Sequence, residues 1–130
     1  MPHHALCSRV KRSITKRLLD AIESIEAIEC FTQGMSFDDY AANEMATAAV
    51  ERKFEIISEA LKQAAAEDPT IQQAIEVLPR VIVLRNRIAH DYDQTDQEIL
   101  WTIIELWLPK LKSQAKDLLD QYHSPDQHDA

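Results

Sequence analysis

A single glycine among 130 residues is the feature of this sequence that most restricts its fold. Glycine supplies the positive backbone φ angles of tight turns, so a β-rich fold and a glycine-rich phosphate loop are both disfavoured. Hydrophobic residues make up 45% of the chain and charged residues 28%, which is typical of a globular protein large enough for one hydrophobic core. We therefore expect an all-α fold.

Apolar residues recur at the spacing of an α-helix along most of the chain. The first such segment runs from Ser13 to Gln33, and Gly34 stands where a left-handed residue would end that helix. Ser36 and Asp39 then have the spacing of a capping box at the start of the next helix. A hydrophobic staple at this start would pair Met35 with Tyr40.

The helical pattern continues to about Ala66, with Asn43 as a second candidate N-cap that would divide it. Its apolar stripe comprises Val50, Phe54, Ile57 and Leu61. Asp68 as N-cap and Pro69 as first residue predict a short helix next. Pro79 opens a further helix.

Thr95 and Glu98 have capping-box spacing at the start of the last long helix. Pro109 should kink or restart this helix, because proline removes a backbone donor and clashes with the preceding turn. The apolar stripe of the helix comprises Leu100, Ile103, Trp107, Leu111 and Leu118. Together these segments predict an antiparallel helical bundle of four or five main helices, in one domain over residues 1–130 with its core at about 13–121 and mobile tails.

The segment Arg85 to Tyr92 (RNRIAHDY) belongs to a helical pattern that is apolar on two sides. At about 100° per residue, one side carries Val77, Val81, Leu84 and Ile88. The other side, where a surface helix would be polar, places Ile82, Val83 and Ala89 around Asn86 and His90. A helix of this kind lies in the centre of a bundle or in a subunit interface, and we favour the interface.

Arg85 and His90 are five residues apart, so a continuous helix would direct them about 140° away from each other. Two arrangements could still aim both at one phosphate. A two-fold axis past this face would bring Arg85 and His90 from two chains into one cleft, because such an interface places the same patch against itself. Alternatively, the helix ends near Ala89 and the chain turns His90 back.

These side chains carry the chemistry of RNA cleavage without a metal. Neutral His90 can accept the proton of a ribose 2′-hydroxyl, or its imidazolium can protonate the leaving 5′-oxygen. Arg85 offers a charged fork of donors to the phosphate, and Asn86 can orient the imidazole or bind a phosphate oxygen. Attack by the 2′-hydroxyl leaves a 2′,3′-cyclic phosphate and spares DNA. From spacing alone, a structural role remains the commoner explanation, with Arg87 and Asp91 as a plain ion pair.

Arg85-x4-His90-x-Tyr92 resembles the R-x4-H-x-Y motif of HepT-like toxins, a branch of the HEPN ribonuclease superfamily. The similarity spans roughly residues 14–119 and includes the turn at 33–40 (QGMSFDDY), the helix at 50–61 with FEIISEA, and the last helix at 99–108. The chain departs from the family pattern at Ala89, where a larger aliphatic residue is expected, and at Ser58, where glycine is common. These departures leave open a variant with weakened activity.

The resemblance implies a HEPN-like bundle, a homodimer with its cleft at the interface, RNA as substrate and no cofactor. It also implies a partner, a minimal nucleotidyltransferase antitoxin that transfers AMP to the motif tyrosine and with which the dimer could assemble further. Carried over to this chain, Arg85 and His90 are the catalytic pair, Asn86 is the polar support, and Tyr92 is the AMPylation site. AMP beside the cleft would add bulk and negative charge where a phosphate must bind.

The formal net charge of −8 is the main objection to an RNA-binding protein, because an acidic chain repels a polyanion at long range. A basic cluster near the N-terminus could help RNA approach, although a solvated helix start explains it equally well; it comprises Arg9, Lys11, Arg12, Lys16 and Arg17. Glu59 could approach the cleft, but a solvated helix face is the commoner position. Trp101 and Trp107 fit core or interface positions better than base-stacking platforms.

No apolar run approaches the roughly 20 residues of a membrane span, and Cys7 and Cys30 fit a reduced chain, so we expect a cytoplasmic protein. Histidines in the two tails do not predict a metal site. Two hypotheses remain. The first is a ribonuclease toxin neutralised by a nucleotidyltransferase, which Arg85 and His90 favour. The second is a non-catalytic helical module that binds a nucleotidyltransferase and helps present substrate or nucleotide, which the acidic charge favours.

Overall fold

The structure of the protein is a computed structural model, which describes residues 2–76 and 94–123. All described elements are helical, as expected, and no strand occurs within these two ranges. In chain order they are α1 (Pro2–Thr32), α2 (Phe37–Ala41), α3 (Glu44–Glu67), α4 (Thr70–Ala74), α6 (Gln94–Thr102), the π-helical segment η1 (Ile103–Trp107) and α7 (Leu108–His123).

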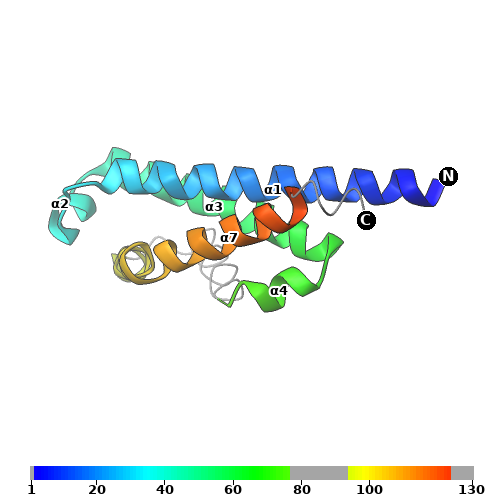
Figure 1. Cartoon of the computed structure of the whole chain (residues 1–130). Coiled ribbons are helices and arrows are strands. Elements are labelled where there is room, and N and C mark those ends of the chain that lie inside the picture. Colours follow the sequence, from blue (N-terminus) through cyan, green and yellow to red (C-terminus); the bar gives the residue numbers. More distant parts are fainter. Residues whose placement is uncertain (1, 77–93, 124–130) are drawn as a thin grey trace.

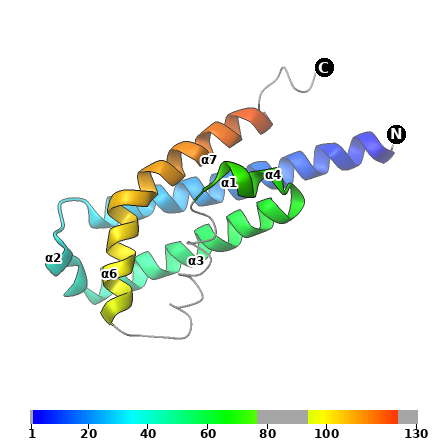
Figure 2. The ribbon, with the colours of Figure 1, turned by 90° about the horizontal axis from the view of Figure 1, so that it is seen from below.

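Three long helices form the body of the molecule, because α1 packs along both α3 and α7 (Figures 1 and 2). Ser13 in the N-terminal half of α1 donates a hydrogen bond of 2.9 Å to Glu67 at the end of α3, while α2 connects the other ends, so these two helices are antiparallel. The short helix α2 links them at one end of the bundle, and α4 folds back onto α7 at the other. The prediction of an antiparallel all-α bundle is confirmed.

The core lies between these helices and uses the residues that the apolar periodicity selected. The stripe of α3 is fully buried at Val50, Ile57 and Leu61, with Phe54 1% exposed. The opposing face of α1 and the inner face of α7 complete the same cluster, with Ile14, Leu18, Ile25, Ile28, Leu108, Leu111 and Leu118. Burial of each large apolar side chain contributes about 1.5–3 kcal/mol to the free energy of folding. This seam is therefore the main source of stability.

The start of α1 differs from the prediction, because the helix begins at Pro2 and not at Ser13. The apolar repeat marks only the part of α1 that is covered by other helices. The preceding residues need no burial to be helical, since proline suits the first position of a helix and Ala5, Leu6, Arg9 and Arg12 have high helix propensity.

The turn between α1 and α3 follows the sequence signals closely. Gly34 has a φ of 77°, the left-handed conformation expected of it. Ser36 and Asp39 form the predicted capping box, in which the Ser36 hydroxyl accepts from the Asp39 amide and the Asp39 carboxylate accepts from the Ser36 amide, both at 3.1 Å. Asn43 caps α3 as expected by accepting from the Ala46 amide at 3.0 Å.

The helix after α3 starts one residue later than predicted. Pro69 occupies the N-cap position of α4, and Thr70 is its first residue. Asp68 nevertheless supplies the capping oxygen, because its carboxylate accepts from both the Thr70 amide at 3.1 Å and the Thr70 hydroxyl at 2.7 Å.

The C-terminal helical region confirms the expected effect of Pro109 but not the expected cap. Gln94 already belongs to α6, so Thr95 lies inside the first turn and is not its N-cap. Pro109 lies two residues after the π-helical turn η1, at whose end the Leu108 amide donates to the Ile103 carbonyl. This wider turn is where α6 and α7 take different directions (Figure 2).

Candidate functional site

The four predicted site residues, Arg85, Asn86, His90 and Tyr92, lie outside the described residues, as does the helix expected from Pro79. They belong to the stretch 77–93, which we call the motif segment. The structure does describe the residues immediately before and after it. We call these two described flanks the N-terminal and C-terminal anchors of the motif segment.

The N-terminal anchor of the motif segment is Ile75, which is fully buried in the core and closes α4 with a 3.0 Å backbone bond to Ile71. The next residue, Glu76, accepts a hydrogen bond from Lys110 of α7 at 2.6 Å. This bond and the charge of Lys110 hold the pKa of the Glu76 carboxyl below its usual value. Both side chains are largely in water, so the pair contributes little to stability.

The C-terminal anchor of the motif segment is a polar network at the start of α6. The Tyr40 hydroxyl of α2 donates to Gln97 Oε1 at 2.6 Å, and Gln97 Nε2 donates to Glu51 Oε1 of α3 at 3.2 Å. Tyr40 is fully buried, and burial together with the Glu51 charge raises the pKa of its phenol. The neutral phenol is therefore a dependable donor, and one glutamine joins three helices.

Aromatic rings reinforce the C-terminal anchor. Trp101 of α6 stacks on Tyr40 with ring centroids 5.1 Å apart and meets Phe37 edge-on at 6.3 Å. Such ring pairs stabilise the fold beyond the free energy that burial of the rings contributes. Trp107 lies farther along, with the Lys110 ammonium 6.0 Å from its ring centre. Both tryptophans pack against the core, which confirms the structural interpretation of these residues.

Sequence reasoning missed this network, because its members are far apart in the chain. Gln97 is 57 residues from Tyr40 and 46 residues from Glu51. Helical spacing relates only residues three or four apart, so it gives no signal for such a contact. The one hint is that Tyr40 is a buried tyrosine, whose hydroxyl requires a partner.

A mixed-charge groove of ≈ 280 Å³ lies between α1 and α3. It is lined by Arg17, Asp20, Arg52, Glu55, Ile56, Glu59 and Ala60. Arg52 is paired with Glu55 at 3.2 Å, and the exposed Glu59 accepts from Gln63 at 2.9 Å. Glu59 is thus the solvated helix-face residue that was the commoner expectation. Carboxylates outnumber guanidinium groups here, so the groove is poorly suited to phosphate.

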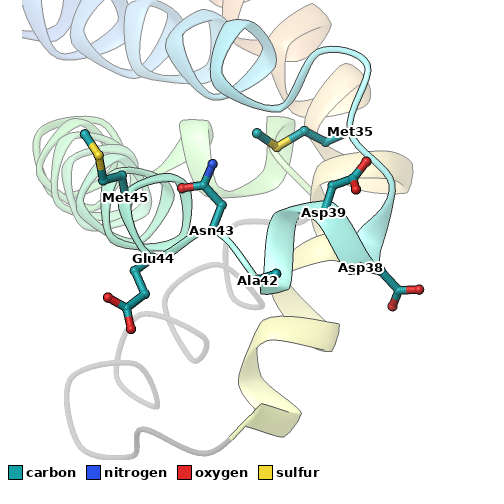
Figure 3. A pocket seen from close by; sticks show the side chains of 7 residues that line it. All are labelled: Met35, Asp38, Asp39, Ala42, Asn43, Glu44 and Met45. Carbon is teal, nitrogen blue, oxygen red and sulfur yellow. The ribbon is translucent and has the colours of Figure 1, made fainter.

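A second pocket, of ≈ 820 Å³, lies where α2 meets the start of α3 (Figure 3). Its lining comprises Met35, Asp38, Asp39, Ala42, Asn43, Glu44 and Met45. Three of these side chains are acidic and none is basic. An RNA backbone would be repelled at this end of the bundle, so neither pocket is suited to bind RNA.

No group of three or more His, Cys, Asp and Glu side chains in residues 2–76 and 94–123 is placed to hold a metal ion. Within the same ranges, no helix has both the length and the apolar character needed to cross a membrane.

Comparison with known proteins decides the family. The chain matches the ribonuclease HepT-like family over residues 21–118, a range that includes the motif segment. The chain belongs to this family. A protein of Thermococcus cleftensis named "Probable ribonuclease HepT" is 31% identical over 84% of this chain and 98% of its own length. A protein of Methanocaldococcus jannaschii named a "Putative RNase" is 29% identical over 82% of this chain and 96% of its own length. No solved structure matches the chain significantly.

Membership of the ribonuclease HepT-like family confirms the resemblance that the motif indicated. The matched range contains both anchors of the motif segment, from Tyr40 and Glu51 to Gln97 and Lys110. The basic cluster at residues 9–17 lies before that range and is not part of the family match.

Proposed function

We propose that this protein is the toxin of a toxin–antitoxin pair and cleaves RNA internally without a metal, with Arg85 and His90 as its catalytic pair. The observation that carries the proposal is the family match over residues 21–118, which includes Arg85-x4-His90-x-Tyr92. The described frame supports it, because two firmly packed elements, α4 and α6, bound the segment that contains these residues.

The proposed reaction uses the ribose as its own nucleophile. Neutral His90 accepts the proton of the 2′-hydroxyl, and the 2′-oxygen attacks the adjacent phosphorus. The bond from phosphorus to the 5′-oxygen breaks, and an imidazolium donates the proton that this leaving oxygen needs. The products are a 2′,3′-cyclic phosphate and a 5′-hydroxyl. Arg85 stabilises the charge that builds on the phosphate, and Asn86 supports the imidazole.

A homodimer would complete this site, because its two-fold axis can bring Arg85 of one chain to His90 of the other. Mixing the Arg85→Ala and His90→Ala proteins tests this directly. Heterodimers would contain one cleft with both native residues, so we expect about a quarter of the wild-type rate from a mixture of two inactive proteins. Two clefts that are each built from a single chain would give no recovery.

Control of the nuclease would act on Tyr92, two residues after His90. A nucleotidyltransferase antitoxin would attach AMP to the Tyr92 hydroxyl and so place a phosphate and a nucleoside beside the cleft. The intact mass after co-expression with the adjacent gene product should increase by whole AMP units. Tyr92→Phe should abolish this increase, and Tyr122→Phe is the matched control that should not.

The cleavage test compares wild type freed of AMP with His90→Ala in the presence of EDTA. Loss of a general acid–base group is expected to slow cleavage about 10²- to 10⁴-fold. His123→Ala, which removes another histidine, should cleave at the wild-type rate. Full cleavage by His90→Ala, or none by the wild type, would refute the nuclease proposal.

The net charge of −8 favours a second candidate, a non-catalytic module that binds a nucleotidyltransferase and helps present substrate or nucleotide. The acidic pocket at α2 and α3 is consistent with it, since this pocket repels nucleic acid. Under this alternative, the AMP-free wild type would bind the nucleotidyltransferase tightly and leave RNA intact.

A further inference from the structure

The charges of this protein are strongly segregated along the chain. Five of the 14 basic residues and none of the 22 acidic residues lie in the first 19 positions. The remaining 111 residues therefore hold nine basic and 22 acidic residues, a formal charge of −13. The net charge of −8 thus hides a positive N-terminal segment on an acidic body, and a polyanion would meet the two parts very differently.

The positive segment extends beyond the helices that flank it. Ser13 is hydrogen-bonded to Glu67, the last residue of α3, and Tyr122 near the end of α7 donates to Asp68. The described parts of α3 and α7 therefore end at about the level of Ser13. The residues of α1 from 2 to 12 continue past them by about 16 Å, at 1.5 Å per residue, as both views show (Figures 1 and 2). We call residues 2–17 of α1 the basic arm.

Helical phase gathers part of this charge on one face of the basic arm. Arg9, Arg12 and Lys16 are three and four residues apart and fall within about 60° of one another around the axis. This arc points away from the buried side of α1, which carries Ile14 and Leu18, and all three side chains are exposed. They form a continuous basic stripe about 10 Å long.

The cations of the basic stripe have no carboxylate partner within the described residues, as is also true of Lys11, Arg17, Lys53 and Lys62. Arg52, Lys110, Lys112 and Lys116 each pair with a glutamate within 4 Å. Within the part of the chain that the structure describes, Arg9, Arg12 and Lys16 form no ion pair or hydrogen bond. A ligand could therefore bind these charges without breaking a contact to any described side chain.

We propose that the basic stripe of Arg9, Arg12 and Lys16 is an RNA-binding surface that contacts the phosphate backbone of the substrate. Its residue types, arginine and lysine, are those that bind phosphate. A protein partner would need apolar anchors at the centre of the contact. Among the described side chains on the face of the basic stripe, no apolar one precedes Leu19. This absence favours RNA over a protein as the ligand.

This assignment rests on the proposed ribonuclease function for its biological meaning, but binding is measured without cleavage. It also answers the objection raised by the acidic composition. The chain needs no overall positive charge, because a projecting arm can attract the polyanion while the acidic body prevents RNA from binding along unproductive faces. Phosphate contacts carry no base information, so the stripe should bind RNA without sequence preference.

The test measures binding of a fluorescent single-stranded RNA with 2′-O-methyl groups throughout, which lacks the nucleophile and cannot be cleaved by the proposed reaction. The full-length wild type is compared with a variant that combines Arg9→Gln, Arg12→Gln and Lys16→Gln. Lys53→Gln, Lys62→Gln and Lys116→Gln together are the matched control, with the same loss of charge on the acidic body. Kd is measured by anisotropy at salt concentrations between about 50 and 200 mM.

We expect the slope of log Kd against log salt to fall by about 2 in the arm variant, since each lost phosphate contact on single strands removes roughly 0.7. The control variant should keep the wild-type slope. Equal slopes for arm and control variants, or no RNA binding by the wild type, would overturn the assignment. A change in oligomer mass by light scattering with unchanged RNA binding would overturn it too, since the stripe would then contact protein. Binding through the arm without any cleavage of unmodified RNA would instead refute only the nuclease proposal.

Discussion

The motif segment is held very differently at its two ends. On the N-terminal side, one buried side chain, Ile75, is followed at once by a solvent-exposed ion pair between Glu76 and Lys110. On the C-terminal side, Gln97 is locked to the buried Tyr40, and Trp101 stacks on the same ring. The described frame is therefore packed more firmly on the α6 side of the motif segment than on the α4 side.

The largest effect should come from removing the centre of the C-terminal anchor. Tyr40→Ala deletes a fully buried ring together with its stacking on Trp101 and its bond to Gln97. We expect the free energy of unfolding in urea to fall by about 3–5 kcal/mol, the usual cost of an aromatic core truncation. Phe31→Ala, at a ring that is 38% exposed, is the control and should cost much less. Similar losses for the two variants would contradict the comparison.

A smaller effect is expected when only the hydroxyl is removed. Tyr40→Phe keeps the ring but leaves Gln97 Oε1 without its donor in a partly buried position. The free energy of unfolding should fall by about 1–2 kcal/mol, the cost of an unsatisfied polar group. A double-mutant cycle with Gln97→Leu should recover part of this loss, and purely additive losses would show that the bond itself contributes nothing.

Alkaline pH should weaken the C-terminal anchor selectively. The pKa of Tyr40 in the folded protein lies above its ordinary value of 10.0, because burial and the Glu51 charge disfavour the phenolate. The stabilising contribution is thus complete below pH 10 and is lost progressively above it, as the unfolded chain ionises more readily. The difference in unfolding free energy between wild type and Tyr40→Phe should therefore shrink as pH rises past 10, and a constant difference would contradict this.

The smallest effect is expected at the N-terminal anchor. Lys110→Gln removes an exposed ion pair, and the midpoint of thermal unfolding at pH 7 should stay close to that of the wild type. The lowered pKa of Glu76 means that any contribution is present above pH 4.5 and is lost as pH falls below it. A clear destabilisation at pH 7 would show that the two anchors are more alike than their burial indicates.

The sequence predicted the local features of the fold well. Gly34, the capping box at Ser36 and the cap at Asn43 each act through neighbours within four residues, so spacing alone reveals them. The start of α1 and the start of α6 were predicted wrongly. Helix propensity carries α1 past its buried part, and α6 already includes Gln94, with contacts of Gln97 to Tyr40 and Glu51 in its first turns.

The candidate site, like the fold, could be predicted from the sequence only where its residues are close together in the chain. The motif at Arg85, His90 and Tyr92 is readable from the sequence because its residues are close together, and the family match supports it. The network that anchors it joins residues of three helices, and no periodicity relates them. The basic stripe was visible as a cluster, but the projection of its Arg9 and Arg12 past α3 and α7 follows only from the contacts of Ser13 and Tyr122.

The proposed chemistry is tested most directly by the ends of the cleaved RNA. Wild-type protein freed of AMP is incubated with RNA in EDTA, and the new ends are identified by mass spectrometry, with a strand of the same sequence in DNA as the control. Cleavage that uses the 2′-hydroxyl and His90 predicts 2′,3′-cyclic phosphate and 5′-hydroxyl ends, an intact DNA strand, and products that form about 10²- to 10⁴-fold more slowly with His90→Ala. Cleavage of the DNA strand, 5′-phosphate ends, or undiminished products with His90→Ala would contradict this mechanism.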